Sequence, residues 1–233
     1  MIPLRDDNPA RTVPVVTRTI IVVNVAAFLV ELSRGSELRS FVYAWGLVPA
    51  RLSAAFTGLE PMPVAFTTVL TSMFLHGGWF HVLGNMWYLW IFGDNIEDRL
   101  GSVRFVVFYL LSGLFSALVH VLIHPWSTLP TVGASGAIAG VLGAYALAYP
   151  RARVITLVPV FFFFQVVALP ALLVLGMWFV FQLFSGTFSL GTGATSGVAW
   201  WAHIAGFAFG FLVMGLFGRA PRPSPDWIED RRD

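Results

Sequence analysis

The chain has 233 residues, of which 57% are hydrophobic and only 11% are charged, with a formal net charge of +2. A soluble domain carries about 25% charged residues, so this composition indicates an integral membrane protein surrounded by a lipid bilayer. The absence of cysteine excludes disulfides, thiolate catalysis and iron–sulfur ligation. The basic residues form no stripe that could follow a phosphate backbone, which argues against a nucleic-acid partner.

In chain order, six apolar runs predict transmembrane helices. They cover residues 19–33, 78–94, 104–123, 134–149, 170–186 and 198–218. The predicted fold class is an all-α membrane protein, with a six-helix bundle at 19–218, an N-terminal tail at 1–18 and a C-terminal tail at 219–233.

Two stretches between these runs need a separate account. The loop at 35–77 is long, and we expect it to fold onto the outer membrane face as short amphipathic pieces. No charged residue occurs from Val154 to Phe184, and a single helix across that stretch would overshoot a bilayer. We therefore predict that Val154–Val167 is non-helical or interfacial and that the fifth helix begins near Pro170.

The arginines give the predicted bundle a sidedness. Eleven of the fourteen fall on one side if six helices alternate in direction. By the positive-inside rule, both termini are then expected to be cytoplasmic. The chain shows no recognisable transit peptide before its first apolar run, so the expected location is the plasma (inner) membrane of a bacterium.

Polar side chains recur at one depth in the second, fourth and sixth predicted helices. His81, Ser135 and His203 each lie sixteen residues before a charged residue at the arginine-rich side, and Asn85 lies twelve residues before one. At a rise of about 1.5 Å per residue, the first three stand about 24 Å from that side. Polar groups within a bilayer are costly and mark candidate sites, although serine and small residues in membrane helices more often serve helix packing.

The residue types in this layer fit nucleophilic catalysis. Ser135 is a candidate nucleophile, and His203 is a candidate base that could activate it. His81 and Asn85 are spaced i, i+4 on one helix face, where both could donate hydrogen bonds to a developing oxyanion. The chain contains no Asp or Glu between Asp98 and Asp226, so these helices allow a Ser-His dyad but no triad.

Glycines accompany both halves of the candidate dyad. Gly133 and Gly136 flank the serine, while Gly206 and Gly210 share a helix face with the histidine. Faces made of small residues let two helix backbones approach closely. We therefore expect these four glycines to serve the helix packing that brings the imidazole within reach of the hydroxyl.

Other chemistry-bearing side chains have simpler interpretations. His120 and His124 are spaced i, i+4 and could in principle bind a metal, but no cysteine or nearby carboxylate completes a ligand set. We therefore predict no metal and no cofactor. Trp178 is interpreted as a lipid-facing or interfacial anchor.

Three motifs resemble those of the rhomboid family of intramembrane serine proteases: HVLGN in the second predicted helix, GASG at the start of the fourth, and AHIAGFAFG in the sixth. The resemblance implies a six-helix fold with a cavity that opens outward, and cleavage of single-span membrane proteins near the outer side of their transmembrane segments. By motif, Ser135 would be the nucleophile and His203 the base, while His81, Asn85 and the Ser135 N–H would form the oxyanion hole. Many members carry an aromatic residue four positions after the serine, and its ring packs against the catalytic histidine. In this chain that position is Ala139.

Two non-enzymatic alternatives differ from this interpretation in testable ways. A rhomboid-like pseudoprotease that binds membrane clients would be expected to lose the serine or the histidine, and both are present. A small channel would carry polar residues along the full length of several helices, whereas here they cluster in one layer. The protease interpretation is therefore favoured.

Overall fold

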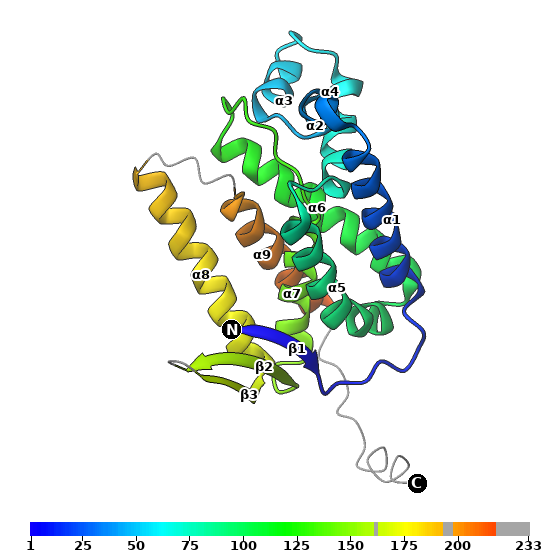
Figure 1. Cartoon of the computed structure of the whole chain (residues 1–233), viewed down its shortest axis with the longest axis vertical. Helices are drawn as coiled ribbons and strands as arrows, with labels where there is room; N and C mark the ends of the chain where they lie inside the picture. The colour runs from blue at the N-terminus through cyan, green and yellow to red at the C-terminus, as the bar shows by residue number, and fades with distance from the viewer. Residues whose placement is uncertain (161–162, 193–197, 218–233) are drawn as a thin grey trace.

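The computed structural model describes residues 1–160, 163–192 and 198–217. Its regular elements in chain order are β1 (Ile2–Asp6), α1 (Val15–Leu32), α2 (Leu38–Trp45), α3 (Pro49–Phe56), α4 (Met62–Thr71), α5 (Trp79–Leu100), α6 (Ser102–Ile123), α7 (Ser135–Ala148), β2 (Arg153–Val160), β3 (Phe163–Pro170), α8 (Ala171–Thr192) and α9 (Trp200–Leu216). Figure 1 shows the long helices running along one axis, with α2–α4 at one end and the three strands at the other.

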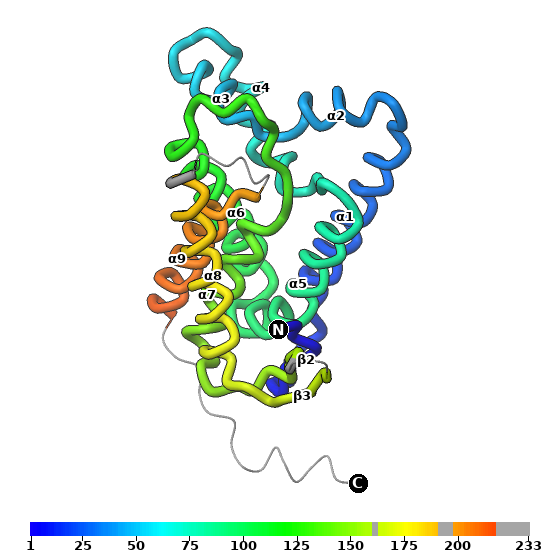
Figure 2. The backbone as a smooth tube through the Cα atoms, turned by 60° about the vertical axis from the view of Figure 1, so that its left-hand side comes forward, coloured from blue at the N-terminus to red at the C-terminus, as the bar shows by residue number. Residues whose placement is uncertain are grey.

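The α7 helix forms the centre of the bundle. It packs against α5, α6, α8 and α9, and most extensively against α9. Nearly every residue from Gly136 to Ala148 is buried, because the small side chains of this segment let neighbouring helices approach it from several sides. In Figure 2, α1 lies on the opposite side of the bundle from α8 and α9.

The predicted apolar runs all contain helices, and the helical membrane bundle is confirmed. Within the described residues, α1, α6 and α8 are long and apolar enough to cross a membrane, whereas α7 and α9 are apolar but shorter. The count of six spans therefore stays a prediction. The division into a bundle and two tails also stays a prediction, and the expected C-terminal tail at 219–233 lies outside the described residues.

The charge-free stretch contains no continuous helix. Strands β2 and β3 pair antiparallel, so the non-helical prediction for Val154–Val167 is confirmed for its described residues, 154–160 and 163–167. The helix α8 begins at Ala171, immediately after Pro170, which confirms the predicted start. The sheet itself was not predicted: β1 comes from the segment interpreted as an N-terminal tail and pairs with β2.

A buried carboxylate at the arginine-rich end fixes the start of α1. The residue at the N-cap, Pro14, offers no side-chain cap to this helix. Instead, Glu97 of α5 accepts hydrogen bonds from the N–H groups of Val16 at 2.9 Å and Thr17 at 2.8 Å. The hydroxyls of Thr17 and Ser102 also donate to it, each at 2.8 Å. Glu97 thus satisfies two N–H groups that have no acceptor within their own helix.

A second polar cluster joins β1 to the bundle. Asp6 accepts hydrogen bonds from the hydroxyl of Tyr145 and, at 3.3 Å, from Nδ2 of Asn95. Asn95 also accepts from Asn8 and donates to Asp94 at 2.8 Å. Burial raises the pKa of the Asp6 carboxyl to about 7, because desolvation disfavours its charged form.

Candidate active site

Ser135 is the first residue of α7, and the preceding turn depends on a glycine. Gly133 has a φ of 132°, a conformation that other residues rarely adopt. Its N–H donates to the backbone oxygen of Ser72 at 2.9 Å, which ties the turn to the segment before α5. The α7 helix has 14 residues and is about 21 Å long. That length is less than the hydrocarbon thickness of about 30 Å, so α7 alone is too short to cross a bilayer.

The imidazole of His203 bridges two side chains from different helices. Its Nε2 lies 2.7 Å from Oγ of Ser135 in α7. Its Nδ1 lies 2.8 Å from Oε1 of Gln182 in α8. These distances are within the range of hydrogen bonds, so α7, α8 and α9 each contribute one member of a linear Ser–His–Gln chain.

Backbone contact between α7 and α9 accounts for the short Ser135–His203 distance. A Cβ atom added to Gly206 would lie 2.1 Å from the backbone oxygen of Gly136, and one added to Gly210 would lie 1.8 Å from that of Gly140. Neither separation is possible for a real Cβ atom. Larger residues at Gly206 or Gly210 would therefore hold the two helices apart.

His81 and Asn85 occupy the first turns of α5, close to the turn that precedes Ser135. Nδ1 of His81 accepts from the N–H of Gly77 at 3.2 Å, so a neutral ring carries its proton on Nε2. A Cβ atom on Gly133 would lie 2.7 Å from that Nε2 and 3.4 Å from Oγ of Ser135. Asn85 is 8% exposed, and its Nδ2 has no hydrogen-bond partner in the described part of the chain. Such an amide is a donor without an acceptor.

The segment leading into α5 is held by a second buried carboxylate. Glu31 of α1 is 1% exposed and accepts from the N–H of His76 at 2.9 Å. The ring of His76 packs edge-on against His81, with ring centroids 5.1 Å apart. Burial and the neighbouring histidine lower the pKa of His76 to about 4, so this ring is neutral at pH 7.

Aromatic rings also flank His203, although Ala139 supplies none. The ring of Trp178 in α8 lies 6.1 Å from the imidazole, and that of Trp200 in α9 lies 6.4 Å from it, centroid to centroid. Trp178 also contacts Phe207 at 6.1 Å. Trp178 is half-buried, so its ring packs against the histidine in addition to any contact with lipid or the interface.

No metal-ligand cluster accompanies the remaining histidines. His120 and His124 lie with ring centroids 5.1 Å apart, and Nε2 of His120 is 3.0 Å from Oγ1 of Thr131. Among the residues that the structure describes, no group of three His, Asp or Glu side chains could hold a metal ion.

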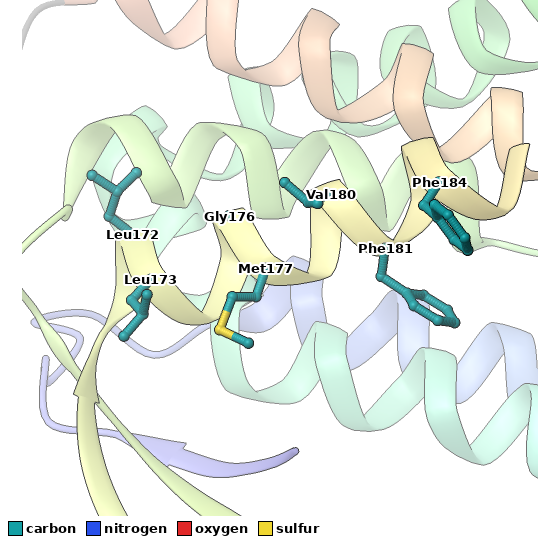
Figure 3. Close-up of a pocket in the computed structure, with 7 residues that line it drawn as sticks. All are labelled: Leu172, Leu173, Gly176, Met177, Val180, Phe181 and Phe184. Atoms are coloured by element: carbon teal, nitrogen blue, oxygen red, sulfur yellow. The ribbon is translucent and has the colours of Figure 1, made fainter. Parts of the chain in front are cut away.

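A surface hollow on α8 lies away from these residues and is apolar. Figure 3 shows it along the outward face of α8, and it is lined by Leu172, Leu173, Gly176, Met177, Val180, Phe181 and Phe184. These side chains offer neither a nucleophile nor an acid or base. The hollow therefore differs in chemistry from the polar layer, which faces the other side of the same helix.

Gln182 is the residue that the sequence interpretation missed. It is 5% exposed and belongs to the charge-free stretch that was assessed only for its length. A lone amide in an apolar helix was the available signal, since burying an unpaired amide is costly. Which residue it contacts depends on how α8 is rotated about its axis, and that rotation is set by packing.

A model of the rhomboid domain family matches residues 64–220. The chain belongs to the rhomboid family. It is 35% identical over 149 residues to mouse presenilin-associated rhomboid-like protein, mitochondrial, a match that covers 61% of this chain and 39% of the mouse protein. It is 31% identical over 163 residues to Arabidopsis thaliana RHOMBOID-like protein 4, covering 70% of this chain and 36% of that protein. The chain spans less than half the length of these relatives.

The expected bacterial plasma membrane was wrong. The mouse relative is named as mitochondrial, and so is Arabidopsis RHOMBOID-like protein 6, which is 38% identical over 76 residues, or 33% of this chain and 24% of that protein. The prediction that both termini are cytoplasmic came from the arginine split and was made for that membrane, so it is wrong together with it. Arginine counts distinguish one face of a bundle from the other, but they do not identify the membrane.

Proposed function

We propose that the chain is an intramembrane serine endopeptidase in which Ser135 is the nucleophile and His203 the general base. The observation that carries this proposal is the 2.7 Å separation of Ser135 Oγ and His203 Nε2 inside a helical bundle. A serine hydroxyl is a weak nucleophile until an adjacent base accepts its proton. Family membership and the match over residues 64–220 support the same reaction class.

In this mechanism, Ser135 Oγ attacks the scissile carbonyl carbon while His203 Nε2 accepts the hydroxyl proton. The carbonyl oxygen becomes an oxyanion, which Nδ2 of Asn85, Nε2–H of His81 and the backbone N–H of Ser135 stabilise. The unpartnered Nδ2 of Asn85 supports this role, because a donor already in place needs no rearrangement as the charge develops. His203 then protonates the leaving amine. In the second half of the reaction, water attacks the acyl-enzyme while His203 accepts its proton, and His203 then returns that proton to Ser135 Oγ as the acid product leaves.

The proposed substrates are single-span membrane proteins, cut near the side of the membrane away from the arginine-rich loops. Ser135 stands at the end of α7 that is remote from Arg151 and Arg153, so a peptide bond must reach that level to be attacked. Because two of the relatives are named as mitochondrial proteins, the proposed membrane for this activity is a mitochondrial one.

A fluorophosphonate probe, which reacts with activated serines, tests the dyad directly in detergent-purified protein. We expect labelling of the wild type at Ser135, none in Ser135→Ala and nearly none in His203→Ala. Cleavage of a single-span model substrate should be lost in the same variants. Ser116→Ala is the matched control, because this buried serine already donates to the backbone oxygen of Ser112 at 2.8 Å. Full labelling of His203→Ala would remove the histidine from the role of base.

A further inference from the structure

Gln182 supplies the contact that the dyad would otherwise lack. It lies in α8, is 5% exposed and projects its Oε1 to 2.8 Å from Nδ1 of His203. An amide buried in an apolar helix is costly unless it is hydrogen-bonded. The contact with His203 is the hydrogen bond that the structure gives to this side chain.

The direction of this hydrogen bond determines where the imidazole carries its proton. A carbonyl oxygen can only accept, so Nδ1 of His203 donates and carries the hydrogen. In a neutral ring, Nε2 then has its lone pair free, and that atom faces Oγ of Ser135 at 2.7 Å. This is the tautomer in which the ring can take the serine proton. The opposite tautomer would point an N–H at the hydroxyl and could not accept.

We propose that Gln182 is a positioning residue for catalysis: it holds His203 in the tautomer and ring orientation that the general base requires. The proposal rests on the proposed function and adds a third member to the Ser135–His203 pair. It acts through the histidine and needs no contact with the substrate.

Other residues do not provide this function. No Asp or Glu occurs between Asp98 and Asp226, so a carboxylate on these helices is unavailable. Trp178 and Trp200 flank the ring at centroid distances above 6 Å, and ring contacts do not select between the two nitrogen atoms. A neutral amide orients the ring without adding a buried carboxylate charge beside it. Such a charge would have to be desolvated.

Three substitutions of Gln182 test separately the hydrogen-bond acceptor, the shape of the side chain and its length. Gln182→Met keeps the unbranched shape without an acceptor, and Gln182→Asn keeps the amide but withdraws it by one methylene. Gln182→Glu keeps an acceptor oxygen at the same reach. Gln165 is the matched control, because the sequence contains only two glutamines and this one is exposed in β3. For each variant, kcat and KM for a single-span substrate and the rate of fluorophosphonate labelling at Ser135 are measured.

We expect Gln182→Met and Gln182→Asn to lower kcat and the labelling rate by about 10- to 100-fold at an unchanged KM, because each leaves the buried Nδ1–H without its acceptor. Gln182→Glu should restore most of the labelling rate, and Gln165→Met should match the wild type. Equal losses in the Met and Glu variants, or a raised KM with unchanged kcat, would overturn the positioning role. Wild-type protein that is not labelled at Ser135 would instead refute the proposed function itself.

Discussion

The two ends of the bundle differ in how far the hydrogen bonds of their buried polar groups are satisfied. At the arginine-rich end, Glu97 accepts four hydrogen bonds, and Asn95 both donates and accepts within a cluster that includes Asp6. At the opposite end, Nδ2 of Asn85 is buried without a hydrogen-bond partner among the residues that the structure describes. The buried polar groups at the first end hold elements of the fold together, whereas Asn85 at the second end keeps a hydrogen-bond donor available.

This contrast helps to separate structural polar groups from functional ones. A satisfied network stabilises the fold, while an unsatisfied buried group lowers stability and persists where it has another use. The criterion is not sufficient alone, because the hydroxyl of Tyr109 in α6 and Oδ1 of Asn24 in α1 are also buried without partners among the described residues. Asn85 differs from these two because it shares its end of the bundle with a hydrogen-bonded serine and histidine.

The largest effect is expected from a methyl group in the seam between α7 and α9. Gly206→Ala would place Cβ 2.1 Å from the backbone oxygen of Gly136, so α9 must move away from α7 and take His203 with it. We expect cleavage to fall below detection and stability to fall by about 1–3 kcal/mol or more. The measurements are substrate cleavage and unfolding in detergent.

Gly215→Ala, on the same helix but at the arginine-rich end, is the matched control. Its added Cβ would lie 3.6 Å from Leu147, an ordinary contact, so activity and stability should remain close to those of the wild type. Equal losses of activity and stability in the two variants would mean that α9 is sensitive to any substitution. The close backbone approach at Gly206 would then not explain its effect.

A second prediction compares two asparagines on α5. Asn85→Ala should lower kcat by about 100-fold, in the range typical for the loss of one oxyanion donor. It should not lower stability, because Nδ2 of Asn85 forms no hydrogen bond with any described residue. Asn95→Ala should do the reverse, since it removes a partner of Asp94 and Asn8. Steady-state kinetics and thermal unfolding of both variants test this pair. A stability loss in Asn85→Ala with unchanged kcat would contradict the oxyanion role.

The third prediction concerns stability alone. Glu97→Ala leaves two backbone N–H groups and two hydroxyls without an acceptor, and we expect a loss of about 3 kcal/mol. Asp98→Ala removes an adjacent carboxylate that also accepts two hydrogen bonds from Thr12, but at the exposed surface, so about 1 kcal/mol or less is expected. Unfolding in detergent measures both. Equal losses would show that burial of Glu97 adds nothing.

The sequence predicted what depends on composition and on position along a helix. Apolar runs located the helices, and residue counts along the helices predicted that Ser135 and His203 share one depth. It did not predict contacts that depend on the rotation of one helix against another, such as Gln182 with His203, or pairing over long separations, such as β1 with β2.

The smallest expected effect is a pH dependence confined to the arginine-rich end. Burial raises the pKa of Asp6 from 3.8 to about 7, with Asp94 and Asp7 adding repulsion. Between about pH 4 and pH 7, the unfolded chain has released this proton while the folded chain still binds it. The free energy of unfolding must therefore fall as pH rises through that window.

Asp6→Asn should abolish this dependence, because the amide keeps an acceptor for the Tyr145 hydroxyl and cannot ionise. Between pH 5 and pH 8, we expect wild-type stability to fall by about 1–2 kcal/mol relative to the variant. Equilibrium unfolding in detergent at the two pH values measures the difference. Asp7→Asn serves as control, since the Asp7 carboxylate is exposed and accepts from the N–H of Arg153 at 2.7 Å. It removes only a smaller cause of the raised Asp6 pKa and leaves the burial of Asp6 in place, so it should retain most of the wild-type slope. A wild-type protein that gains stability relative to Asp6→Asn over this range would mean that the carboxyl is held in its charged form. In that case a charged Asp6 carboxylate, and not a protonated Asp6 carboxyl, would hold β1 to the bundle.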